Sequence, residues 1–74
     1  MNPVETKRIR KILKAKGCTM TQAKGSHEKW TTSGGLSDTI VAGDREQSPG
    51  LLRNIQTVFE PEFGAKWLEK ELGR

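Results

Sequence analysis

The chain has 74 residues, enough for one small domain, and 32% hydrophobic and 30% charged residues are typical of a globular protein. A single cysteine, Cys18, excludes an internal disulfide, and with a single histidine, His27, the chain offers few ligands for a structural metal. No apolar run approaches the ~20 residues of a membrane span and no signal peptide is apparent, so we expect a cytoplasmic protein.

The net charge of +4 is unevenly distributed along the chain. Residues 1–30 hold eight basic and two acidic residues, a balance of +6, whereas residues 31–74 hold five basic and seven acidic residues, a balance of −2. Such asymmetry favours a polyanionic partner, most often nucleic acid, although a solvated basic helix would have the same composition.

Residues 2–17, NPVETKRIRKILKAKG, are predicted to form the first helix. Asn2 is a suitable N-cap, Pro3 suits the first helical position and Gly17 suits the position after the last turn. The apolar residues that recur at helical spacing are Val4, Ile9, Ile12 and Leu13.

Three short strands are predicted over residues 18–24, 27–33 and 36–42. The Lys-Gly-Ser sequence at 24–26 is predicted to form the first turn, and two consecutive glycines at 34–35 indicate a hairpin. In the second strand, side chains alternate between the two faces of the sheet. One face carries His27, Lys29 and Thr31, and the other carries Glu28, Trp30 and Thr32.

A second helix is predicted after a loop over 43–47, with Ser48 as N-cap and Pro49 in its first turn. Pro61 is predicted to end this helix, and residues 62–73, EFGAKWLEKELG, to form a short third one. The core stripe of the second helix consists of Leu51, Leu52, Ile55, Val58 and Phe59, and the third helix would contribute Phe63, Trp67, Leu68 and Leu72.

The predicted order of elements indicates an α+β fold, with two helices on one face of a three-stranded antiparallel sheet. The other face of the sheet is left to solvent or ligand. Residues 1–60 would form the domain, and residues 61–74 a helical C-terminal extension.

His27 is the candidate catalytic residue, because an imidazole exchanges protons near neutral pH. RNA carries its own nucleophile, the ribose 2′-hydroxyl, so one imidazole could serve as general base or acid in its cleavage. Lys24 and Lys29 could stabilise phosphorane charge, and Gly25 and Ser26 allow close approach of a phosphate. An ordinary surface histidine in a turn is the alternative.

Residues 5–59 resemble the HicA toxins, the mRNA-interferase half of bacterial HicAB toxin–antitoxin pairs. The similarity rests on three groups of residues. These are a helix end and turn with Gly17, Lys24, Gly25, Ser26, His27 and Trp30; a third strand with Thr39, Ile40 and Val41; and a helix start with Pro49, Gly50, Leu52, Arg53 and Ile55.

The resemblance implies a fold like that of double-stranded-RNA-binding domains, with the order α-β-β-β-α. It also implies ribosome-independent cleavage of mRNA with His27 as the catalytic residue, no metal or other cofactor, and neutralisation by a HicB antitoxin that covers the site. The family often has a second histidine after the motif histidine and another after the third strand, where this chain has Glu28 and Gly43. Glu28 would either orient His27 or weaken phosphate binding.

Two further functions are compatible with the sequence. One is a non-catalytic RNA-binding module of the same fold, although such domains usually begin their last helix with a lysine cluster, and this helix begins Ser-Pro-Gly-Leu-Leu at 48–52. The other is a protein-interaction domain in which the basic face and Trp67 meet an acidic partner.

Overall fold

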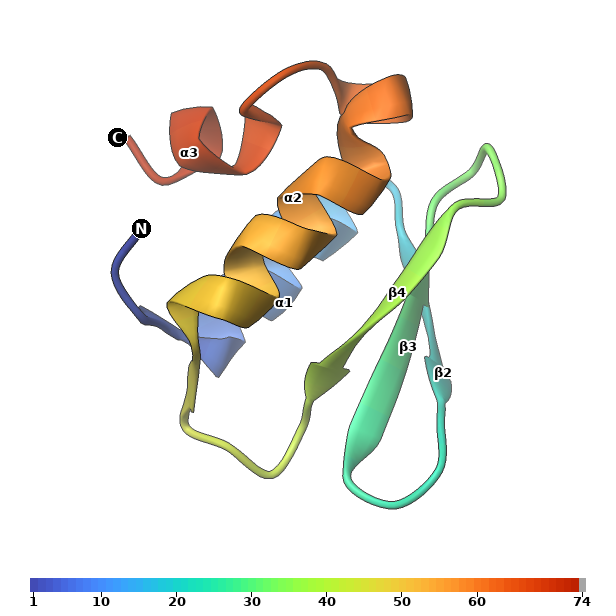
Figure 1. The fold of residues 1–74 in the computed structure, drawn as a ribbon. Helices are drawn as coiled ribbons and strands as arrows, with labels where there is room; N and C mark the ends of the chain where they lie inside the picture. The colour runs from blue at the N-terminus through green and yellow to red at the C-terminus, as the bar shows by residue number, and fades with distance from the viewer. Residues whose placement is uncertain (74) are drawn as a thin grey trace.

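A computed structural model describes residues 1–73 of the chain. Three helices and a three-stranded sheet account for most of it (Figure 1). The elements in chain order are β1 (Val4–Glu5), α1 (Thr6–Ala15), β2 (Thr19–Gln22), β3 (His27–Thr31), β4 (Ser37–Val41), β5 (Glu46–Gln47), α2 (Pro49–Phe63) and α3 (Trp67–Glu71).

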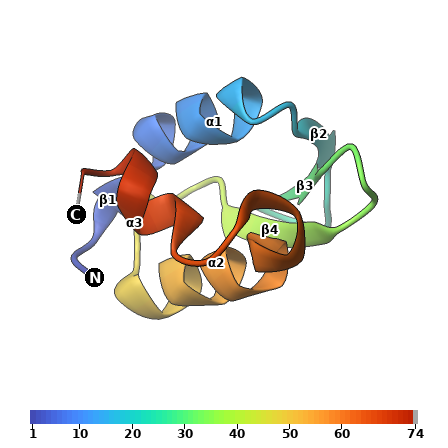
Figure 2. The same cartoon turned by 90° about the horizontal axis from the view of Figure 1, so that it is seen from above.

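The main sheet is antiparallel with the strand order β2-β3-β4. Helices α1 and α2 lie on the same face of it, α1 towards β2 and α2 towards β4, as the view from above shows (Figure 2). The opposite face carries no element of the described chain (Figure 1). The predicted α+β fold with the layout α-β-β-β-α is therefore confirmed, with α3 added after it.

The core lies between the sheet and the helices. Residues from the apolar stripes of α1 and α2 are fully buried there, and Trp30 of β3 lies among them with 1% of its surface exposed. Each large side chain that is fully buried stabilises the fold by ~1.5–3 kcal/mol. The buried apolar residues are Val4, Ile9, Leu13, Cys18, Trp30, Ile40, Leu52, Ile55, Phe59, Trp67, Leu68 and Leu72.

The prediction for the N-terminal segment is wrong in one respect, because α1 begins at Thr6 rather than near Pro3. Val4 and Glu5 instead pair with β5 in a two-stranded antiparallel ladder, so the expected loop over 43–47 contains a strand. The Thr6 hydroxyl donates to the Asp44 carbonyl at 2.6 Å, which holds the start of α1 to this segment. A long-range pairing of this kind leaves no local pattern in the sequence.

The strands are shorter than predicted, but their alternation is as expected. Glu28 and Trp30 are buried on the helix side of β3, whereas His27 and Lys29 are exposed on the other side. Cys18 is buried just before β2, and burial is the main cause that raises the pKa of its thiol. Cys18 is therefore a core residue and a poor nucleophile.

Helix α2 begins as predicted, with the Ser48 hydroxyl accepting from the Leu51 amide at 3.3 Å. Pro61 does not end it; the helix continues to Phe63 and stops at Gly64. The continuation places the Glu62 carboxylate where it accepts hydrogen bonds from the Thr32 hydroxyl and from the amide of Gly34 in the β3–β4 turn. A side chain at Gly34 would displace that carboxylate from its position against the turn.

Helix α3 packs its apolar residues on the domain core. Trp67 is 2% exposed, stacks on Phe59 with 6.0 Å between ring centroids, and donates its indole N–H to the Gln56 carbonyl at 3.0 Å. Lys16, the residue that follows α1, forms an ion pair with Glu71 of α3 at 2.8 Å. A third helix is thus present, but it is shorter than the predicted range 62–73, because residues 62–63 belong to α2 and α3 begins only at Trp67. It covers the core between α1 and α2.

Candidate functional site

The turn between β2 and β3 carries the residues singled out by the sequence. Gly25 has φ +68°, a backbone conformation that glycine adopts without strain. The turn is closed by the His27 amide, which donates to the Lys24 carbonyl at 3.4 Å, and by the Gln22 amide group, which donates to the Gly25 carbonyl at 3.3 Å. Lys24, Gly25 and Ser26 are all exposed.

His27 is the first residue of β3, and its side chain lies on the open face of the sheet. It is exposed and, within residues 1–73, makes no side-chain hydrogen bond or ion pair. Its cross-strand partner on β4 is Val41. The structure thus leaves the imidazole accessible to a bound molecule.

The open face of the sheet around His27 is rich in hydroxyl groups. Lys29 lies one outward position further along β3, about 6.6 Å away by strand geometry, and is flanked by Thr21 and Thr39 on the neighbouring strands. The next row pairs Thr31 with a threonine and a serine. No carboxylate side chain belongs to the open-face positions of these three strands, so the face is suited to an anionic chain.

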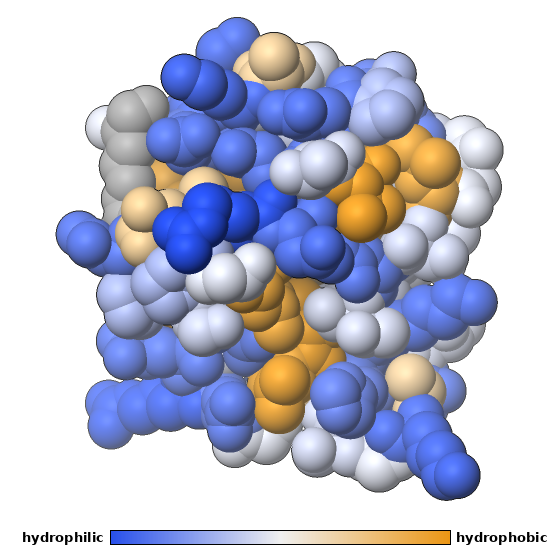
Figure 3. Space-filling view, in the orientation of Figure 1, coloured by the Kyte–Doolittle hydropathy of each residue, from blue (hydrophilic) through white to orange (hydrophobic). Residues whose placement is uncertain are grey.

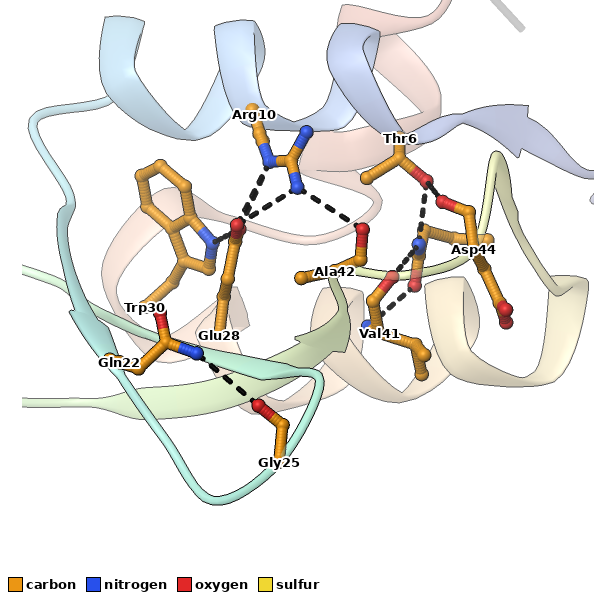
Figure 4. Close-up of polar contacts among 10 residues, drawn as sticks. Thr6, Arg10, Gln22, Gly25, Glu28, Trp30, Val41, Ala42 and Asp44 are labelled. Atoms are coloured by element: carbon orange, nitrogen blue, oxygen red, sulfur yellow. Dashed lines mark hydrogen bonds and ion pairs between the residues drawn. The ribbon is translucent and has the colours of Figure 1, made fainter.

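The Glu28 side chain lies on the opposite face, beneath α1 (Figure 4). The Arg10 guanidinium donates to both of its carboxylate oxygens, with the shortest N–O distance 2.9 Å, and the Trp30 indole donates to one of them at 3.2 Å. The side chain of Glu28 is 9% exposed and that of Arg10 is 34% exposed. The buried carboxylate is thus fully satisfied.

This contact explains the electrostatics of Glu28. The hydrogen bonds from Arg10, and then that from Trp30, hold the pKa of Glu28 below its ordinary value of 4.5, although burial acts in the opposite direction. The same bonds raise the pKa of Arg10. Glu28 is therefore ionised at neutral pH and does not act as a general acid there.

The structure does not bring the Glu28 carboxylate to the His27 imidazole, since adjacent residues of a strand point to opposite faces. The sequence suggested that Glu28 could orient His27 directly. Its carboxylate partners are instead Arg10 and Trp30. Any effect of Glu28 on the imidazole is therefore indirect, through its electric field or through the backbone.

Such a backbone connection exists at the end of β4. Arg10 also donates to the Ala42 carbonyl at 3.4 Å, and the Ala42 amide donates to the Ser26 carbonyl. The Arg10–Glu28 pair and the turn before His27 are therefore both hydrogen-bonded to Ala42, the pair through the Ala42 carbonyl and the turn through the Ala42 amide. Arg10 was not among the residues predicted for the site; one cation among the several on a basic helix carries no sequence signal that distinguishes it from its solvated neighbours.

A second network supports the other edge of β4. The Gln47 side chain is 1% exposed; its amide accepts from the Val41 N–H at 3.0 Å and donates to the Val41 carbonyl at 2.9 Å and to the Thr6 hydroxyl at 2.7 Å. Both polar backbone groups of Val41 therefore bond to Gln47. Figure 4 shows this network beside the Arg10–Glu28 pair.

The comparisons with known proteins can now be set beside this geometry. A family model described as the HicA toxin of bacterial toxin–antitoxin systems matches residues 6–60, which include α1, all of β2 to β5 and most of α2. Comparisons with curated proteins and with solved structures give no match. In the described part of the chain, no helix is both long and apolar enough to span a membrane. The match covers well over half of the sequence, and the chain belongs to the HicA toxin family.

Proposed function

We propose that the protein is an endoribonuclease that cleaves mRNA, with His27 as its catalytic residue. The observation that carries the proposal is the place of His27 in a HicA-family chain. It is exposed at the end of a carboxylate-free sheet face, directly after a turn with a flexible glycine and next to two lysines, Lys24 and Lys29.

In the proposed reaction the ribose 2′-oxygen attacks the adjacent phosphorus. His27 accepts the 2′-hydroxyl proton, the new P–O bond forms, and the bond to the 5′-oxygen breaks. The 5′-oxygen leaves with a proton, which the imidazolium can return. The products are a 2′,3′-cyclic phosphate and a 5′-hydroxyl, so atoms and charges balance without a cofactor.

The residues around His27 have distinct roles in this proposal. The ammonium groups of Lys24 and Lys29 stabilise the additional negative charge of the phosphorane. Gly25 has no side chain to obstruct the phosphate, and Ser26 offers its hydroxyl and amide as donors. These groups all belong to one turn and the strand that follows it.

Arg10 and Glu28 are proposed as positioning residues. Their contact joins α1 to β3 beneath His27, and Arg10 reaches the Ala42 carbonyl as well. Ala42 in turn holds the Ser26 carbonyl through its amide. The pair thereby restricts the turn that places His27 relative to the phosphate.

As a toxin of a toxin–antitoxin pair, the chain has an antitoxin as its partner. We propose a HicB-type antitoxin that covers the face bearing His27, and we propose that both act in the cytoplasm. Because the open face is cationic and hydroxyl-rich, an antitoxin that inhibits by covering it would present carboxylates to Lys24 and Lys29.

The test is cleavage of a labelled single-stranded RNA by the purified chain and by His27→Ala, each with and without EDTA. We expect the variant to lose at least a hundredfold in rate, the usual contribution of general acid–base catalysis. Lys70→Ala, an exposed change on α3, serves as the control and should cleave normally. Cleavage by His27→Ala at the wild-type rate would overturn the proposal. Tight binding of duplex RNA without any cleavage would instead indicate a non-catalytic RNA-binding module.

A further inference from the structure

An open hollow lies beside the end of β4, one strand away from the proposed catalytic residue. Its volume is about 280 Å³, and it is formed where β4, β5 and the first turn of α2 meet the N-terminal segment. Figure 3 shows apolar surface on this side of the molecule, between α2 and the end of β4. The proposed function gives no role to this hollow.

The hollow adjoins His27 through Val41, which lines it and is the cross-strand partner of His27. The Val41 N–H donates to Gln47 and its carbonyl accepts from Gln47 and from the Asp44 amide, whereas the neighbouring residues Ser26 and Ala42 hydrogen-bond across the strands. Because hydrogen-bonded and non-hydrogen-bonded pairs alternate, His27 and Val41 form a non-hydrogen-bonded pair. In such pairs the two side chains lie on the same face with Cβ atoms about 4.5–5.5 Å apart. His27 does not itself line the hollow, and the Val41 side chain is what separates the hollow from the imidazole.

The walls of the hollow combine apolar and acidic groups. Pro3, Val41, Pro49 and Leu51 supply flat and branched aliphatic surface. Its volume lies at the lower end of the range for small-molecule sites, which suits a ring system smaller than a drug-sized ligand. Gln47 contributes to the floor, but both ends of its amide are already bonded within the protein.

Two carboxylate residues, Asp44 and Glu46, also line the hollow. In Figure 4 the Asp44 carboxylate points away from the Thr6 contact, which uses only the Asp44 backbone carbonyl. The two side chains are exposed, and a carboxylate is an acceptor only. An occupant of this hollow should therefore present N–H donors and no phosphate.

We propose that the hollow binds one unpaired nucleobase of the RNA, next to the phosphate held at His27, and that Asp44 and Glu46 favour a base with an exocyclic amino group. The proposal rests on the proposed function, because it uses an RNA chain that passes His27. Unstacked bases of single-stranded RNA are commonly held in this way, between apolar surfaces with their edges hydrogen-bonded.

The expected preference follows from the hydrogen-bonding edges of the bases. Adenine and cytosine present an amino group that donates to a carboxylate. Uracil presents carbonyl oxygens on both sides of its single N–H, and these oxygens face the carboxylates unfavourably. The hollow should therefore bind a base that has an exocyclic amino group more tightly than a base that lacks one.

The test uses 2′-O-methyl tetranucleotides of adenosine, cytidine and uridine, which cannot be cleaved because they lack the 2′-hydroxyl. Their dissociation constants are measured at one salt concentration, with backbone amide shifts recorded by NMR. We expect the adenosine and cytidine probes to bind the wild-type chain about tenfold more tightly than the uridine probe, as for a hydrogen bond to a charged acceptor. Amides of Val41 and Leu51 should shift.

Two double variants are compared. The first, Asp44→Asn with Glu46→Gln, removes the two carboxylates of the hollow. The second, Glu60→Gln with Glu71→Gln, is the control and removes the same amount of charge on the α2–α3 side. The first pair should reduce the base preference to within about twofold, and the second should preserve it. Equal affinities for the three probes, no binding, or a preference unchanged by the first pair would overturn the inference. So would binding of the probes without amide shifts at Val41 and Leu51.

These outcomes separate the two proposals. If His27-dependent cleavage occurs but the base preference does not depend on Asp44 and Glu46, the nuclease proposal stands and the base site is wrong. If the base preference is found but RNA is not cleaved, the base site stands and the nuclease proposal is wrong.

Discussion

Arg10 on α1 and Glu28 on β3 form a bidentate ion pair whose shortest N–O distance is 2.9 Å, across 18 residues of sequence. The pair lies under the strand that begins with His27, and it is the main polar contact between α1 and the sheet in the described chain. Four predictions about stability follow from this contact and from the other networks around the site.

Replacement of Arg10 by methionine should destabilise the fold by about 2–3 kcal/mol, because Glu28 would keep a buried charge with only the Trp30 indole as donor. The double variant Arg10→Met with Glu28→Met should recover part of this loss, since it removes both charges. Urea unfolding measures both. Single and double variants of equal stability would show that the cost is lost packing rather than an unpaired carboxylate.

Acid should weaken the Arg10–Glu28 contact selectively. Because the pKa of Glu28 is lowered in the folded state, the stability that the contact contributes is fully present above the ordinary pKa of 4.5 and is lost as the pH falls through the lowered value. Unfolding midpoints of the wild type and of Glu28→Gln should therefore converge between neutral pH and about pH 3. Parallel midpoints over that range would contradict the prediction.

Replacement of Gln47 by leucine should destabilise the chain by about 2–3 kcal/mol, because the Val41 amide loses its partner and the Val41 carbonyl keeps only the Asp44 amide, at 3.2 Å. Gln22→Leu is the control. Its exposed side chain makes one hydrogen bond, to the Gly25 carbonyl at 3.3 Å, so its effect should stay within about 0.5 kcal/mol. Thermal unfolding measures the stability of both variants. Equal losses of stability would mean that the buried hydrogen bonds of Gln47 contribute no more than the exposed one of Gln22.

Helix α3 should be part of the folding unit. Trp67→Ala should cost about 3–5 kcal/mol, enough to unfold much of so small a domain. Trp67→Phe keeps a ring against Phe59 but loses the hydrogen bond to the Gln56 carbonyl, and should cost about 1 kcal/mol. Circular dichroism measures both. If neither substitution changes stability, α3 serves a partner rather than the core.

Much of the fold is readable from the sequence because its signals are local. Alternating residues of β3 assign Glu28 and Trp30 to the core and His27 to the open face, and the Ser48-Pro49 start of α2 is a short-range cap. The end of α2 could not be read from local signals. Pro61 predicts that the helix stops there, but the helix continues to Phe63, and Glu62 in this last turn contacts the β3–β4 turn, which is distant in sequence.

The sequence by itself determined the layout of the elements and the position of His27 at the start of a strand, directly after an exposed turn, because periodicity, caps and turn residues act between neighbours. Only the tertiary structure decided what lies around that turn: Glu28 bonded to Arg10, Val41 held by Gln47, and a hollow lined by Val41, the cross-strand partner of His27. These arrangements join residues far apart in the chain. Their energies depend on burial and on the geometry of two elements at once, and neither is encoded in a local pattern.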